Sequence, residues 1–476
     1  MSSIKIKSLV KWIFMVQFLP IFVYAQSQMD QHNPKRDTVI RNPDANQDTV
    51  LRYSVEADLI NSFPPPNGSV LNRTVMPGKY FDWKTKLQEK TGFRFAISYT
   101  AMFLGVPQSQ VVTDSSINSA IGGVLQIEAQ WHFNRGKDYE GGITAVLDWR
   151  HALGSNNRMP GTLFKEVGSG IGVDAAFLPW DPYTSVLYWQ QYLKKDRFWF
   201  RIGQTNPALM MDFFRYKDPR VSFTSTVNTG PVASIPLHPS SLGIGFNWYP
   251  IKGSKDLYVA GVLNDLNVEI GNLNWGSLFK YGEFYTALEI GKNWRRSPGN
   301  FDHLHIMFFY ADKKSTAGVK VNNQFIPFPT SAGWGFKVAG EKQWNKLVTF
   351  ANYTYNTATG GGLNVFTNMQ HSITAGMGYN RPANIRGEIG FMVNLSSIIE
   401  ARANKVNNPQ NPSEVILSRL VGVARNVPQF SSEIYWRILL MKQLWVTPGV
   451  QAFVNPTFNT RTDFIVAPSI KARIYF

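Results

Sequence analysis

The sequence predicts an all-β fold: a transmembrane antiparallel β-barrel of about 16 strands, preceded by a short N-terminal periplasmic helix. Segments that alternate polar and apolar residues recur from residue 92 onward, and each is about nine to fifteen residues long. A membrane-crossing strand needs about 9–11 residues, whereas strands of globular proteins average about 5–6. The connections between the segments also alternate between short and long, which is typical of outer-membrane barrels.

Residues 1–25 have the composition of a secretory signal peptide. Three lysines precede an apolar run from Trp12 to Val23, and the small residue Ala25 follows. We expect cleavage after Ala25. A retained membrane anchor is the alternative, although the apolar run is short for a spanning helix.

Residues 26–91 form a second unit, a flexible polar leader followed by a short amphipathic helix. The leader, up to about residue 78, is polar and contains prolines, with little periodicity. In the stretch "KYFDWKTKLQEKTG", Trp83 and Leu87 share one helical face and Gly92 provides a stop signal. A plain linker helix and a pore-plugging helix both stay open.

Residues 92–476 form the predicted barrel. In its first segment, Phe95 and Ile97 share one face while Arg94 and Ser98 share the other, as expected for a sheet with one polar face. Sixteen segments follow this pattern, an even number as in bacterial single-chain barrels. They lie near 92–103, 120–133, 141–152, 183–193, 196–205, 239–250, 255–266, 280–294, 303–313, 331–341, 345–357, 369–380, 384–395, 430–441, 444–455 and 464–476.

The predicted barrel has short turns at its periplasmic end and long loops at its outer end. The short turns include 194–196, 251–254, 381–383 and 442–443. The loop at 206–238 is long and carries methionine, phenylalanine and arginine. A loop of this length can fold inward and narrow the lumen, or it can pack against a neighbouring subunit. Both arrangements stay open.

Composition argues against several other classes of protein. The chain contains no cysteine, so neither a disulfide framework nor a thiolate metal site holds it together. No stretch of 18 apolar residues without a charge follows the signal segment, so spanning helices are not expected. The net charge is +16, but the charges are spread singly along alternating segments, so nucleic-acid binding is not expected.

The polar face of the strands would line the lumen, and sixteen strands leave room for an aqueous channel. Passive diffusion of small hydrophilic solutes is therefore the predicted function, with no cofactor required. Carboxylates accept hydrogen bonds from sugar hydroxyls and guanidinium groups donate them, although the same charges can simply pair across the wall. The candidate pore-lining and sugar-contact residues are Glu128, Asp148, Arg150, Arg197, Arg201, Glu433, Arg437 and Arg473.

Other chemistry has little support in the sequence. Ser169 stands between two glycines but lacks the spacing of a nucleophile elbow. His303 and His305 share one face of a strand without an acidic or cysteine partner set nearby in sequence, so no metal site is predicted. A general or anion-preferring channel and, less favoured, a barrel hydrolase stay as alternatives.

The sequence ends on "DFIVAPSIKARIYF", a strand pattern that continues to Phe476. Ile470 and Phe476 fall on the lipid face, and Lys471 and Arg473 fall on the lumen face. We expect this strand to pair with the first strand, because a sheet survives in hydrocarbon only when it is closed.

Three stretches resemble the carbohydrate-selective outer-membrane porins of the OprB type: residues 82–100, 200–214 and 433–476. The resemblance covers about 82–476 and implies a sixteen-stranded, sugar-preferring channel in the bacterial outer membrane. It implies small carbohydrates as solutes and contacts with outer-membrane lipids and lipopolysaccharide. Phe476 then resembles the signal that the barrel-assembly machinery recognises. A homo-oligomer is left open.

Overall fold

The computed structural model includes the barrel strands and the segment that precedes them. The signal segment and most of the leader lie outside the residues that it describes, as do residues 213–214 and 228–239 of the loop at 206–238. The described residues are 55–65, 68–107, 118–133, 139–170, 173–174, 176–194, 197–212, 215–227, 240–267, 275–297, 300–321, 324–327, 330–359 and 369–476.

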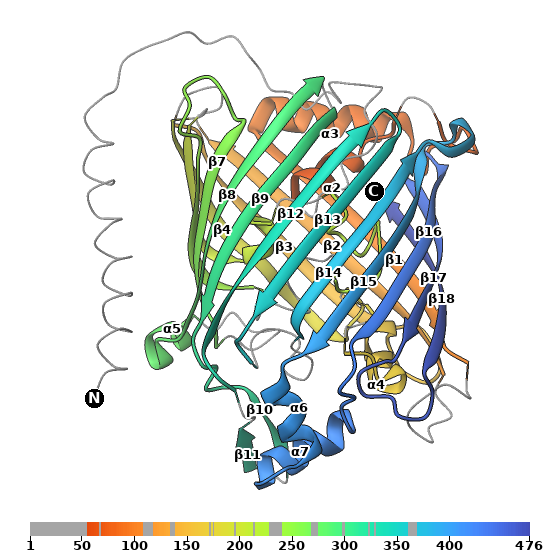
Figure 1. Ribbon diagram of the computed structural model, residues 1–476. Helices are drawn as coiled ribbons and strands as arrows, with labels where there is room; N and C mark the ends of the chain where they lie inside the picture. The colour runs from red at the N-terminus through yellow and green to blue at the C-terminus, as the bar shows by residue number, and fades with distance from the viewer. Residues whose placement is uncertain are drawn as a thin grey trace.

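Sixteen strands of the described chain form one closed antiparallel barrel, and each pairs with its neighbours in chain order (Figure 1). A separate hairpin, β10 (Gly318–Val321) with β11 (Gln324–Pro327), belongs to one of the long loops. The barrel strands are β1 (Phe93–Gly105), β2 (Ser119–Phe133), β3 (Gly141–Ala152), β4 (Trp180–Lys194), β5 (Phe198–Thr205), β6 (Ser241–Trp248), β7 (Leu257–Asp265), β8 (Phe284–Ser297), β9 (Asn300–Ala311), β12 (Gly333–Trp344), β13 (Leu347–Asn356), β14 (Met369–Asn380), β15 (Gly387–Ile398), β16 (Gln429–Met441), β17 (Leu444–Val454) and β18 (Phe464–Tyr475).

The barrel closes where β1 pairs with β18, as the sequence predicts. Thr100 lies opposite Arg473 in this register, and the backbone N–H of Phe476 donates to the Ile97 carbonyl at 2.8 Å. The two faces of β18 are also as predicted, since Ile470 is 46% exposed and Lys471 is 2% exposed. This pairing leaves no unpaired sheet edge to face lipid.

The short turns and the long loops lie at opposite ends of the barrel (Figure 1). The long-loop end carries four short helices, and none of the described helices is long and apolar enough to cross a membrane. The four are α4 (Phe164–Val167), α5 (Gly276–Tyr281), α6 (Glu400–Asn407) and α7 (Pro412–Val421).

Two helices precede the barrel at its short-turn end. The predicted helix is α3 (Gly78–Thr91), which lies across this end and stops at Gly92, whose φ of 76° suits glycine (Figure 1). Its buried face differs from the expected one, because Lys84 is buried whereas Trp83 is 51% exposed. The preceding helix, α2 (Val55–Asn61), has no counterpart in the sequence prediction.

Two of the long loops pack against the inner wall of the barrel. The loop between β3 and β4 places Leu163, Val167 and Phe177 against inward side chains such as Leu104 of β1 and Ile465 of β18. The loop between β5 and β6 packs against other parts of the wall. These apolar contacts remove side chains from water, which favours the inward position of both loops.

Candidate functional site

The described part of the loop between β5 and β6, within residues 206–227, crosses the inside of the barrel. Near its start, Met210 belongs to an apolar cluster with Tyr258 of β7. Further along, the ring of Phe223 lies 5.8 Å from that of Phe350 on β13 and 4.7 Å from that of Tyr435 on β16, measured between centroids. The loop therefore narrows the lumen, which is one of the two positions considered for it.

Polar contacts also fix this loop to the wall. Asp212 lies 2.8 Å from the ammonium of Lys337 on β12, and Tyr216 donates its hydroxyl hydrogen to Glu388 on β15 at 3.0 Å. Burial alone would raise the pKa of Asp212, but Lys337 and a hydrogen bond from His305 outweigh it and hold this pKa well below its usual range. Asp212 is therefore ionised.

Glu433, one of the predicted lumen residues, holds the same loop. Its carboxylate accepts the backbone N–H groups of Thr224 at 2.6 Å and Ser225 at 2.9 Å. The ammonium of Lys471 on β18 donates to the carbonyl of Pro219 at 2.8 Å. These wall charges satisfy backbone groups of the loop that are buried inside the barrel.

A second buried charge cluster joins α2 to the barrel seam. Asp58 of α2 accepts hydrogen bonds from Arg473 at 2.8 Å and from the hydroxyl of Tyr475 at 2.9 Å, and it lies 3.2 Å from Arg220 of the inward loop. Glu128, another predicted residue, is buried beside Asp58. Burial raises the pKa of Asp58, but Arg473 and Arg220 together outweigh burial, so the pKa is lowered.

Apolar packing places α2 inside the short-turn end of the barrel. Leu59 is buried in a cluster with Ala96 of β1, Val146 of β3, and Val186 and Tyr188 of β4. Each of these wall residues has the parity of an inward-facing position on its strand. Helix α2 therefore occupies the lumen, whereas α3 lies across its end.

Asp148 and Arg150 of β3 form a bidentate ion pair, with N–O distances of 2.9 Å and 3.0 Å. The same guanidinium donates to the carbonyl of Ala176 at 2.8 Å and lies 3.6 Å from the ring centre of Trp180. Both charged residues are buried. Their contacts fasten the loop between β3 and β4 to the wall.

Arg201 of β5 differs from these residues because its side chain stays partly exposed. Its Nε donates to Gln190 of β4 at 2.7 Å, and its guanidinium lies 4.7 Å and 4.8 Å from the ring centres of Tyr188 and Trp199. Contacts of this cation–π type orient a guanidinium without occupying all of its five N–H donors.

The last two predicted residues lie in other settings. Arg197 precedes β5 at a short turn, outside the strands, and donates to the carbonyl of Pro250 at 2.6 Å. Arg437 of β16 is buried, with its guanidinium 4.7 Å from the ring centre of Trp445. Arg197 therefore joins two neighbouring turns, although the alternation of β5 gives it the same parity as Arg201.

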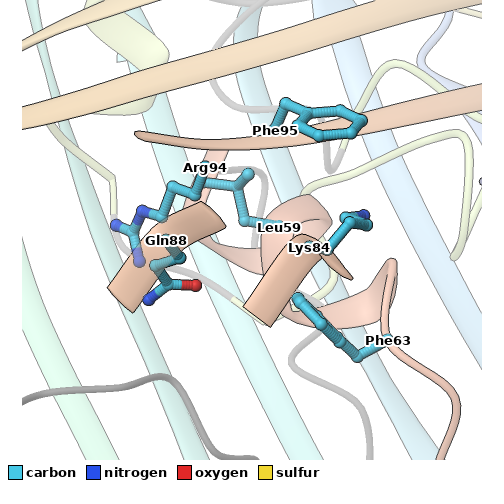
Figure 2. A pocket seen from close by; sticks show the side chains of 6 residues that line it. All are labelled: Leu59, Phe63, Lys84, Gln88, Arg94 and Phe95. Carbon is cyan, nitrogen blue, oxygen red and sulfur yellow. The ribbon is translucent and has the colours of Figure 1, made fainter. Parts of the chain in front are cut away.

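A small cavity of about 10 Å³, room for about one water molecule, lies between α2, α3 and β1. Figure 2 shows Phe63, which follows α2, together with Lys84 of α3 and Phe95 of β1 around this cavity. The ammonium of Lys84 donates to Ser62 at 3.0 Å and to the backbone oxygen of Phe476 at 3.3 Å. Burial lowers the pKa of Lys84 to about 8.

Sequence reasoning missed the residues that contribute from outside the strands. Asp58 lies in the polar leader, and Asp212 and Arg220 lie in a loop without periodicity. The Asp58–Arg473 contact joins residues 415 apart, and the Asp212–Lys337 contact joins residues 125 apart. No local pattern in the sequence indicates pairs at such separations.

Comparison with known proteins supports the fold. No protein-family model matches the chain, and no curated protein matches it. The high-pH structure of Pseudomonas putida OprB is similar with a TM-score of 0.62 and 16% identity, covering 85% of this chain and 99% of that chain. The low-pH structure of the same protein gives a TM-score of 0.47 at 10% identity, with 85% and 99% coverage.

A further solved structure is a loop-deletion mutant of OmpT, an outer-membrane protein of Vibrio cholerae. Its TM-score is 0.45 at 9% identity, and the match covers 81% of this chain and 99% of that chain. At 16% identity, the likeness to the high-pH OprB structure concerns the fold alone. The match to OprB confirms the sixteen-stranded barrel and the resemblance that the sequence suggested.

Proposed function

We propose that this protein is a porin of the bacterial outer membrane, through which small hydrophilic solutes diffuse passively, sugars among them. One observation carries the proposal: a closed barrel has an apolar outer face and a polar, charged inner face. Such a wall satisfies every strand N–H and C=O within lipid while keeping its interior suitable for water and solutes. The OprB-like fold supports the proposal.

The solute path follows the wall near Arg201. Most other predicted lumen charges are buried, because they hold α2 or one of the two inward loops. Arg201 keeps part of its guanidinium accessible, between the rings of Tyr188 and Trp199. Guanidinium N–H groups donate to sugar hydroxyls, and an aromatic ring covers the apolar face of a sugar.

The alternatives to a sugar channel give different results in transport assays. An anion-preferring channel would use the same Arg201, since a cation in a narrow, low-dielectric passage attracts anions. A barrel hydrolase has less support, because Ser169 accepts a hydrogen bond from Gln429 at 2.8 Å and thus serves the packing of its loop.

Liposome swelling tests the proposal directly. Reconstituted protein is expected to pass glucose faster than larger sugars and faster than charged solutes of similar size. The variant Arg201→Gln should change the order of these rates, while Arg419→Gln, at an exposed position of α7, should leave it unchanged. Equal rates for solutes of matched size would remove the sugar preference, and an absence of any conductance would contradict the channel itself.

A further inference from the structure

A buried cluster of histidine and acidic side chains lies where the inward loop meets the wall. His303 and His305 project from β9, and Glu289 projects from the adjacent strand β8. All three are buried, and their ligating atoms lie within 4.8 Å of one another. The sequence separates Glu289 from the histidines, so this partner became visible only in the folded barrel.

Hydrogen bonds outside the cluster fix the tautomers of both rings. Nδ1 of His303 lies 2.7 Å from Oδ1 of Asn293, whose amide nitrogen donates to the Lys255 carbonyl at 3.3 Å. Nε2 of His305 lies 3.1 Å from Oδ1 of Asp212, whose Oδ2 accepts a hydrogen bond from the ammonium of Lys337 at 2.9 Å. Neutral rings therefore carry their hydrogens on these two outer nitrogens.

The inner nitrogens then face each other as two acceptors. Nε2 of His303 and Nδ1 of His305 are 2.8 Å apart, and with these tautomers both present lone pairs. Two lone pairs at this distance repel, and a cation between them converts the repulsion into attraction. The carboxylate of Glu289 borders the same space and accepts a hydrogen bond from the hydroxyl of Tyr258.

We propose that His303, His305 and Glu289 bind a divalent transition-metal ion, with Zn²⁺ as the most suitable, and that this ion fastens the inward loop to the barrel wall. Two imidazole nitrogens and one carboxylate form a known zinc donor set, with a fourth position for water or another oxygen. The Tyr258 hydroxyl lies 3.3 Å from Nε2 of His303.

The geometry requires only a small adjustment. Zinc–nitrogen bonds of about 2.0–2.1 Å at a tetrahedral angle separate two nitrogens by about 3.3 Å. The present separation of 2.8 Å therefore has to grow by roughly half an ångström. Asn293 and Asp212 already hold the outer ring nitrogens, as the outer partners of metal-bound histidines do.

The hydrogen bonds of Asp212 explain why a bound ion would fasten the inward loop to the wall. Asp212 belongs to the inward loop, and it contacts His305 through its carboxylate and Glu289 through its backbone N–H. The ammonium of Lys337 forms an ion pair with the Asp212 carboxylate at 2.8 Å, and the ammonium of Lys217 donates to the Asp212 backbone carbonyl at 3.1 Å. Two of the three ligands are thus joined to the loop by hydrogen bonds.

Metal titration of the purified full chain in detergent tests the site without reference to transport. After treatment with a chelator, the barrel should bind one Zn²⁺ per chain by calorimetry. It should also bind Co²⁺ with the intense visible absorption of a tetrahedral site, which Zn²⁺ then displaces. The variants His303→Gln, His305→Gln and Glu289→Gln should each weaken binding at least about 100-fold, and Asp212→Asn about 10–100-fold.

A matched control is His371→Gln, which removes a histidine that contacts Tyr353 on the outer face. This variant should bind Zn²⁺ as the original chain does. Migration as a folded barrel in unheated gels identifies variants that assemble. Should a ligand variant fail to assemble, the Co²⁺ spectrum of the unaltered chain decides. A Co²⁺ spectrum without tetrahedral bands overturns the proposal, and so do equal Zn²⁺ affinities in the ligand and control variants. In that case, a proton shared between His303 and His305 accounts for the short distance between their inner nitrogens.

Discussion

Removing the negative charge of Asp58 is expected to release α2 from the lumen. In the variant Asp58→Asn, Arg473 loses the carboxylate that accepts from its guanidinium at 2.8 Å, while Arg220 retains Asp218 at 2.8 Å. Arg473, which is 1% exposed, would stay buried without its ion pair to residue 58 as long as α2 stays docked. Undocking gives that charge access to water, so the variant favours the undocked state.

The expected size of this effect follows from the burial of the pair. Loss of one partner of a buried ion pair destabilises by about 3–5 kcal/mol. The lower value corresponds to about a 100-fold larger population of undocked helix, at about 1.4 kcal/mol for each factor of ten. The apolar contacts of Leu59, which stabilise docking by about 1.5–3 kcal/mol, stay in place and limit the release.

Thiol labelling measures the undocked population. The chain contains no cysteine, so Ser62→Cys introduces a single reporter directly after α2, at a position that is 0% exposed. Its rate of reaction with a water-soluble maleimide is proportional to the fraction of time that α2 is undocked. In the Asp58→Asn background this rate should rise about 100-fold, up to the limit set by an unstructured peptide.

The control variant is Asp82→Asn, which removes an exposed carboxylate from the neighbouring helix α3. Its labelling rate should match that of the Ser62→Cys chain alone. If Asp58→Asn and Asp82→Asn label within a factor of two of each other, the buried ion pair does not hold α2, and the reasoning from burial is refuted.

Three further predictions concern the loop, the seam and α3. Glu433→Gln weakens two charge-assisted hydrogen bonds to the inward loop, each of which contributes about 1.5–3 kcal/mol. This variant should increase the current noise in single-channel records. The control variant Glu400→Gln, at an exposed position of α6, should not increase it. Deletion of Phe476 removes its hydrogen bond to Ile97 and should lower the amount of folded barrel in outer membranes; unchanged amounts would exclude an assembly role. Lys84 has a folded pKa of about 8, below its unfolded value of 10.5, so the unfolded chain binds more protons between these pH values. Thermal stability should therefore rise from about pH 8 to 10.5, and Lys84→Met should lack this rise.

The strand pattern was predictable to a large degree. All sixteen predicted segments overlap barrel strands, and the opposite exposure of Ile470 and Lys471 matches the predicted faces of the last strand. The reason is local: successive side chains of a strand point to opposite faces, and one face meets lipid while the other meets the interior. The stop of α3 at Gly92 is local in the same way.

The contacts inside the lumen were not predictable from the same signal. Alternation assigns Glu433 and Arg473 to the interior, but it gives no information on which loop or helix meets them there. Helix α2 was missed because its seven residues lie within a polar, proline-bearing segment. Arg197 was assigned to the lumen by alternation, although β5 begins one residue later and Arg197 belongs to a turn.

The sequence by itself determined a closed sixteen-stranded barrel, its lipid face and its seam, because each follows from a two-residue period and from the need to pair every backbone group in hydrocarbon. Only the tertiary structure decided what fills the barrel. Contacts such as Asp58 with Arg473 and Asp212 with His305 join residues far apart in the chain. Their partners depend on how two loops and α2 fold into the lumen, and packing and charge balance inside the closed wall decide that.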